Sequence, residues 1–137
     1  MFIDAGAMVA ILTEEPEGEG FAARLATAER SMTNTLAVFE ATAAVFRKKR
    51  TTIERAEAQV LAFLKLTGVE VTPLGQRDTS LALQACGLYG RHRYPDKQRN
   101  RALNLADCYH YATAKTHRLS ILTNDMAFAE TELPICK

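Results

Sequence analysis

Residues 1–12, MFIDAGAMVAIL, place a charged residue, Asp4, between an apolar triplet and a longer apolar run. The triplet predicts a short strand, and residues 5–12 predict a helix that begins after Asp4, because Asp is a favoured N-cap residue. A strand that runs directly into a helix is the first half of a βαβ unit. Asp4 is therefore expected at the carboxyl end of the first strand.

The rest of the chain continues this alternation of strands and helices. Helices are predicted at residues 18–30, 35–49, 52–66, 77–89, 104–117 and 126–131, and strands at residues 31–34, 69–72, 119–123 and 134–136. Within residues 35–49, apolar side chains recur every three or four positions, which indicates one buried helical face. Phe39, Phe46 and Phe63 are expected in the core. Residues 90–101 have no apolar period and predict a loop.

This order predicts an α/β fold with a central parallel sheet and helices on both faces, because right-handed crossovers pack in that way. The length of 137 residues suits one domain, residues 1–137. In such sheets ligands bind in the crevice outside the carboxyl ends of the strands. That edge is where functional residues are expected.

Composition excludes several classes of protein. Hydrophobic residues make up 47% and charged residues 24% of the chain, which is ordinary for a globular protein and excludes a disordered one. No apolar run reaches the length of a membrane helix, and Asp4 interrupts the N-terminal run, so we expect a cytoplasmic protein with no membrane partner. Cys86, Cys108 and Cys136 are odd in number and lack CxxC spacing, so they are expected to be buried thiols rather than disulfides or zinc ligands.

Four acidic residues are expected at the carboxyl edge of the sheet. Asp4 and Asp125 follow predicted strands, and Asp107 lies in the first turn of the predicted helix 104–117. Glu40 lies in the second turn of helix 35–49, beside its buried face. Carboxylates held close together repel one another unless a cation neutralises them, and oxygen ligands favour Mg²⁺ or Mn²⁺. The expected chemistry is metal-assisted hydrolysis.

Each acid also has a structural interpretation. Asp4 and Asp125 are suitable helix N-caps, and Asp107 is suited to form a capping box with Asn104. Glu40 has no capping role, so its alternative is an ion pair at the rim, for example with Arg47.

Four segments resemble the PIN-domain ribonucleases, specifically VapC-type toxins of bacterial toxin–antitoxin pairs. The resemblance covers essentially the whole chain and rests on the segments MFIDAGAMVAIL, TNTLAVFEATAAV, LNLADCYHYATAK and ILTNDMAF. It implies a PIN-like three-layer fold with about five parallel strands. It also implies a Mg²⁺- or Mn²⁺-dependent endoribonuclease, in which activated water attacks an RNA phosphodiester and leaves 5′-phosphate and 3′-hydroxyl ends.

The resemblance assigns roles to particular residues. Asp4 and Asp107 are the expected metal ligands, Glu40 and Asp125 complete the catalytic pocket, and Thr123 is expected to orient a water. A homodimer and inhibition by a cognate antitoxin are also implied.

Two positions depart from the family pattern. Relatives commonly carry a hydroxyl residue where this chain has Gly6, and many place an acid where it has Ala127.

Residues 91–101, RHRYPDKQRNR, form a segment that we call the basic segment. It is expected to contact RNA phosphates, because guanidinium groups bind phosphate in a bidentate way. The expected RNA-binding residues are Arg91, Arg93, Lys97, Arg99 and Arg101, against the single acid Asp96. The alternative is a solvated loop. His110 and His117, which lie in or at the end of helix 104–117, are expected to be structural.

Other functions stay open at this point. A non-catalytic PIN-fold module that binds RNA or protein is one alternative. A haloacid-dehalogenase-type phosphatase also begins with a strand ending in Asp, but needs a second Asp at the position of Gly6. A histidine-based, metal-free ribonuclease is a further alternative, which activity in EDTA would indicate.

Overall fold

A computed structural model describes residues 1–136; Lys137, the last residue of the expected domain, lies outside the described residues. A five-stranded sheet with strand order β3-β2-β1-β4-β5 forms the centre, and every pairing in it is parallel. The strands are β1 (Phe2–Ile3), β2 (Met32–Asn34), β3 (Glu70–Thr72), β4 (Ile121–Leu122) and β5 (Ile135–Cys136).

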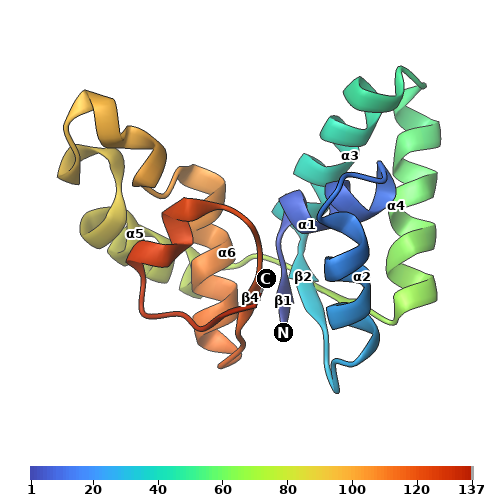
Figure 1. The fold of residues 1–137 in the computed structure, drawn as a ribbon. Coiled ribbons are helices and arrows are strands. Elements are labelled where there is room, and N and C mark those ends of the chain that lie inside the picture. Colours follow the sequence, from blue (N-terminus) through green and yellow to red (C-terminus); the bar gives the residue numbers. More distant parts are fainter. Residues whose placement is uncertain (137) are drawn as a thin grey trace.

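Helices cover both faces of this sheet. They are α1 (Ala5–Leu12), α2 (Gly18–Ala26), α3 (Thr35–Lys49), α4 (Ile53–Thr67), α5 (Gln76–Tyr89) and α6 (Leu105–Thr116), with short 3₁₀ helices η1 (Arg91–Arg93), η2 (Asp96–Arg101) and η3 (Met126–Glu130). In Figure 1 the strands lie between a layer containing α1 to α4 and a layer containing α5 and α6. The predicted α/β fold of three layers and about five parallel strands is confirmed.

The order of the strands determines where the functional edge lies. From β1 the chain builds outward through β2 to β3, and then returns to place β4 on the other side of β1. The switch point of the sheet is therefore between β1 and β4, and ligands of open parallel sheets bind outside the carboxyl ends at such a point. Asp4 follows β1 and Thr123 follows β4, so both lie at the switch point.

The centre of the core is the β1–β4 pair, in which Phe2 lies opposite Ile121 and Ile3 opposite Leu122. All four side chains are fully buried. Burial of a side chain of this size contributes about 1.5–3 kcal/mol, so this pair fixes the two strands firmly. Asp4, which directly follows β1, is thus attached to a fully buried part of the sheet.

Several helix bounds follow from local capping. The side chain of Asn34 accepts a hydrogen bond of 2.8 Å from Ala37 N–H, and α3 therefore begins at Thr35 as predicted. The predicted helix 18–30 ends earlier, at Ala26, where the Thr27 hydroxyl donates to the Arg24 carbonyl.

Other predictions from sequence were wrong in part. Residues 90–101 contain the two 3₁₀ helices η1 and η2. Phe39 and Phe46 are 69% and 40% exposed and lie outside the core, whereas Phe63 is buried as expected.

Of the three cysteines, all free, only Cys108 is fully buried, and Cys86 is exposed. Within residues 1–136 no helix is both long and apolar enough to cross a bilayer.

Candidate functional site

The four predicted acids come from four different elements. Asp4 stands between β1 and α1, Glu40 lies on α3, Asp107 on the first turn of α6, and Asp125 before η3. Asp4 and Asp107 are each only 6% exposed, although carboxylates are rarely buried unless they are paired. Glu40 and Asp125 are half-buried at the rim.

Asp4 occupies the N-cap position of α1, but its side chain makes no capping hydrogen bond. Its Oδ2 instead accepts a hydrogen bond of 2.8 Å from the Thr123 hydroxyl, and its Oδ1 lies 3.2 Å from Nδ1 of His110. The same Thr123 oxygen accepts a hydrogen bond of 3.0 Å from the backbone N–H of Asp125. In this structure Thr123 therefore orients the Asp4 carboxylate, whereas the family resemblance implied that it orients a water.

Asp107 has two functions in the fold. Its Oδ2 accepts a hydrogen bond of 2.8 Å from Asn104 N–H, and its own N–H donates to the Asn104 side chain at 3.0 Å, so the capping box expected from sequence is present. The pKa of Asp107 is raised to about 6, mainly by burial and in part by the charges of Asp125 and Asp4, against the lowering effect of the bond from Asn104. Asp107 is therefore within electrostatic reach of both Asp4 and Asp125.

Glu40 contacts His110, a residue that was not predicted to belong to the site. Its Oε2 lies 3.3 Å from Nε2 of His110, whose side chain is 1% exposed. Burial raises the pKa of Glu40, His110 lowers it, and Asp4 raises it again. Burial lowers the pKa of His110, but Asp4, Glu40 and Asp107 together raise it above its ordinary value. The expected alternative for Glu40, a rim pair with Arg47, is replaced by this buried contact.

A signal for His110 was present in the sequence. It follows Asp107 by three positions on a helix, and side chains at that spacing lie on the same helical face. A buried acid on α6 thus predicts that its i+3 neighbour also faces the pocket. A structural role was expected for His110 because the sequence places no nucleophile pattern near it.

Asp125 has a local partner. Its Oδ1 accepts a hydrogen bond of 2.8 Å from Ala127 N–H, which is the capping role considered from sequence. Its charge nevertheless raises the pKa of Asp107. Asp125 therefore belongs electrostatically to the group and is held at its margin by η3.

The donor set suits a hard divalent cation. Mg²⁺ and Mn²⁺ prefer oxygen ligands, and Mg²⁺ usually binds one or two protein carboxylates together with water and substrate phosphate. Across residues 1–136, no three acidic, histidine or cysteine side chains already form a cage for an ion. Buried atoms that lack a hydrogen-bond partner within the described residues do face the pocket, namely Glu40 Oε2 and both ring nitrogens of His110. An open site with few protein ligands fits this arrangement.

The basic segment is not uniformly available to a ligand. Arg99 pairs with Asp96 at 2.7 Å, and Arg101 pairs with Glu130 of η3. Among the described residues, the remaining three cations of the segment have no carboxylate partner: Arg91, Arg93 and Lys97. Of the five cations expected to contact phosphate, the first three along the segment are thus the ones without a carboxylate partner in the described part of the chain.

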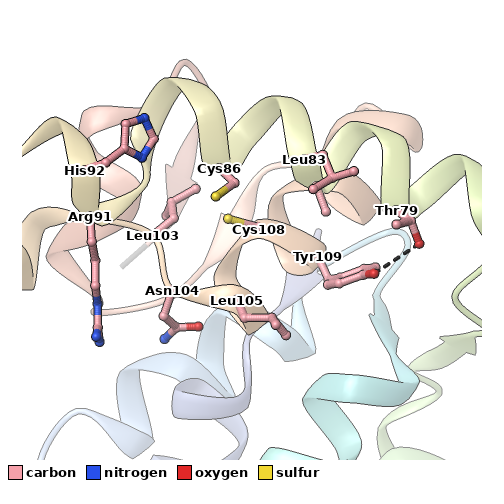
Figure 2. A pocket seen from close by; sticks show the side chains of 11 residues that line it. Thr79, Leu83, Cys86, Arg91, His92, Leu103, Asn104, Leu105, Cys108 and Tyr109 are labelled. Atoms are coloured by element: carbon pink, nitrogen blue, oxygen red, sulfur yellow. Dashed lines mark hydrogen bonds between the residues drawn. The ribbon is translucent and has the colours of Figure 1, made fainter.

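A cavity of about 550 Å³ lies between α5 and α6, next to this segment. Figure 2 shows Leu83 and Cys86 on α5 facing Leu105 and Cys108 on α6, with Arg91 at one end. Its walls are mostly apolar, and none of the four acids lines it. The cavity is therefore separate from the region of the four acids Asp4, Glu40, Asp107 and Asp125, which we call the acidic pocket.

Comparison with known proteins agrees with this geometry. Residues 1–133 match the PIN domain family. A VapC ribonuclease of Rhizobium meliloti (strain 1021) is 31% identical over 144 residues, covering 96% of this chain and 98% of that protein. The crystal structure of Mycobacterium tuberculosis VapC20, described as a sarcin-ricin loop cleaving toxin, has the same fold, with a TM-score of 0.67 and 17% identity over 93% of each chain. The chain therefore belongs to the PIN-domain family, among its VapC-type members.

Proposed function

We propose that this protein is a Mg²⁺- or Mn²⁺-dependent endoribonuclease toxin. The observation that carries the proposal is the group of buried acids at the switch point of the sheet, in which Asp4 and Asp125 help to raise the pKa of Asp107 to about 6. Repulsion of this kind is relieved when a cation binds. The VapC relative named above, which is aligned over nearly its whole length, supports ribonuclease chemistry.

Each acid has a defined part in the proposed reaction. Asp4 and Asp107 hold the metal, since both are buried and each keeps oxygen lone pairs beyond those used in the bonds to Thr123 and Asn104. Glu40 and Asp125 complete the pocket from the rim. When bound, the divalent ion supplies Lewis acidity for in-line attack of water on the RNA phosphodiester, leaving 5′-phosphate and 3′-hydroxyl ends.

The basic segment is the proposed RNA contact. It leads directly into Asn104 and Asp107 at the start of α6, so phosphates bound there lie close along the chain to the acidic pocket. Arg91, Arg93 and Lys97 are the primary contacts, because they have no acidic partner in the described part of the chain. Arg99 and Arg101 contribute less, since each must first break its ion pair, with Asp96 and Glu130 respectively.

The proposal includes protein partners. A cognate antitoxin inhibits the enzyme, and a cationic side chain on it offsets the charge of the acidic pocket. A homodimer is supported by the exposed apolar side chains that α3 and α4 present, namely Phe39, Phe46, Leu61 and Leu66. The proposed site of action is the cytoplasm, where a toxin of this kind would meet cellular RNA.

The test compares purified wild-type protein with Asp4→Asn and Asp107→Asn on single-stranded RNA, with Mg²⁺, with Mn²⁺ and with EDTA. We expect metal-dependent cleavage by the wild type and loss of cleavage in both variants, with folding retained by circular dichroism. Glu29→Gln is the matched control, because Glu29 is an exposed acid in the connection that leads to the amino end of β2, opposite the carboxyl edge of the sheet. Cleavage in EDTA, or activity in both variants, contradicts the proposal. RNA binding without cleavage would instead favour the non-catalytic module.

A further inference from the structure

His110 stands between two acids that come from different parts of the chain. Its Nδ1 lies 3.2 Å from Asp4 Oδ1 and its Nε2 lies 3.3 Å from Glu40 Oε2. Asp4 follows β1, Glu40 lies on α3 and His110 on α6. The imidazole therefore connects three elements at one point of the acidic pocket.

The ring is held in place by packing. Its side chain is 1% exposed, and its centroid lies 5.4 Å from that of Phe2, a fully buried residue of the central strand. A side chain enclosed in this way has little freedom to rotate, because protein interiors are close-packed. The two nitrogens consequently point in fixed directions.

The two acids depend on His110 to different degrees. Asp4 is also held by the Thr123 hydroxyl at 2.8 Å. Glu40 Oε2 has no hydrogen-bond partner within residues 1–136, and the Glu40 side chain is 36% exposed. A carboxylate in this position gains hydration by turning toward solvent, so a cationic or N–H group inside the pocket is needed to direct it inward. His110 is the described group that faces it.

We propose that His110 is a positioning residue for the reaction, which directs the Glu40 carboxylate into the acidic pocket and fixes its place relative to Asp4. This inference rests on the proposed ribonuclease function. It assigns His110 no contact with RNA, because the side chain is buried. Groups that orient ligand carboxylates typically change metal affinity or activity about 10- to 100-fold when they are removed.

Two near-isosteric variants separate the contacts of the ring. The amide nitrogen of His110→Gln replaces Nε2 and faces Glu40, whereas that of His110→Asn replaces Nδ1 and faces Asp4. Because Thr123 already holds Asp4, we expect His110→Gln to retain most of kcat and His110→Asn to fall about 10- to 100-fold, like His110→Ala. KM for RNA should stay within about threefold in all three variants, since the buried ring is assigned no contact with RNA.

A double-mutant cycle tests whether the effect passes through Glu40. We expect Glu40→Gln and His110→Ala to be non-additive in kcat, so that the double variant is little worse than Glu40→Gln alone. His117→Ala is the matched control, because His117 caps the carboxyl end of the same helix and pairs with no acid in the described part of the chain. Equal activity of the Gln and Asn variants, additive losses in the cycle, or full activity of His110→Ala would overturn the proposal.

Binding of Mn²⁺ measured by calorimetry without RNA keeps the two proposals distinguishable. We expect His110→Ala and Glu40→Gln to weaken Mn²⁺ binding to a similar extent, and His110→Gln to weaken it less. If the wild type binds Mn²⁺ but cleaves no RNA, the proposed function fails, and this series still decides the role of His110. Tighter binding by His110→Ala, or no Mn²⁺ binding by the wild type, overturns the inference. If His110→Ala does not fold, the Gln and Asn variants carry both tests.

Discussion

Replacement of Asp107 by Asn should abolish RNA cleavage and at the same time stabilise the metal-free protein. The substitution removes a buried charge but preserves the start of α6, because the amide oxygen can still accept the hydrogen bond that Asn104 N–H donates at 2.8 Å. A residue whose role is only structural would show the opposite sign, since most substitutions at buried positions destabilise a protein.

The magnitude follows from the pKa of Asp107, which burial and the neighbouring charges raise from 3.8 to about 6. At 1.36 kcal/mol per pH unit, ionised Asp107 destabilises the folded state by roughly 3 kcal/mol above that pKa. Loss of a negative charge from the first turn of α6 offsets about 0.3–1 kcal/mol of this. We therefore expect a net gain of about 2 kcal/mol in the free energy of unfolding at about pH 7.5.

The dependence on pH has a definite sign. Because the pKa of Asp107 is higher in the folded state than in the unfolded state, the folded protein takes up the proton first as the pH falls. The stability of the wild type in EDTA should thus rise between about pH 7 and about pH 4, and the rise should be smaller in Asp107→Asn. Added Mg²⁺ should stabilise the wild type and not the variant.

Urea denaturation followed by circular dichroism measures these changes, with cleavage of RNA assayed on the same preparations. Glu29→Gln again serves as the control, because this acid is exposed at the opposite edge of the sheet and its replacement should change neither stability nor activity. A loss of more than about 1 kcal/mol in Asp107→Asn without metal would refute the reasoning, as would a pH profile identical to that of the wild type.

Three further substitutions test the surroundings of the site. A Cβ at Gly6 would lie 3.4 Å from Asp4 Oδ2. Gly6→Ser should therefore place a hydroxyl beside this carboxylate and raise the measured rate of RNA cleavage a few-fold. Gly6→Ala should only stabilise α1, by about 0.5–1 kcal/mol in a urea titration. Thr123→Val removes the hydrogen bond to Asp4 and leaves a buried acceptor unpaired, so the free energy of unfolding should fall by about 1–3 kcal/mol and cleavage should fall with it; unchanged values would contradict the assigned contact. Arg93→Ala should reduce the slope of log K for RNA binding against log salt concentration by about one phosphate contact. Arg99→Ala should reduce this slope by less, because Arg99 pairs with Asp96. Equal slopes for the two variants in a filter-binding titration would argue that the two arginines contact RNA equally.

The fold could be predicted from the sequence where local signals agreed. The bounds of α3 follow from Asn34 as an N-cap residue, and its helical period is clear over residues 35–49. The position of Asp4 after a strand, and of Asp107 within a capping box, likewise depends on neighbours close in the chain. Local chemistry was sufficient for these features.

Features that depend on contacts between distant residues could not be predicted in the same way. The apolar period of α3 does not reveal that Phe39 faces away from the sheet, because that depends on which helices pack beside it. The pairing of Arg101 with Glu130 joins η2 to η3 and reduces the charge that the basic segment offers. The contact of His110 with Asp4 requires the register of β1 relative to α6. In each case tertiary packing decided the outcome.

The strand order has a consequence for the synthesis of this protein. β1 is synthesised long before its partner β4, and Thr123 and Asp125 follow β4 in the chain. A nascent chain that stops before Thr123 lacks the hydroxyl that fixes Asp4, and one that stops before α6 also lacks Asp107. The acids are therefore brought together only after α6 and Thr123 have been synthesised, so a chain that is still short of β4 lacks part of the site.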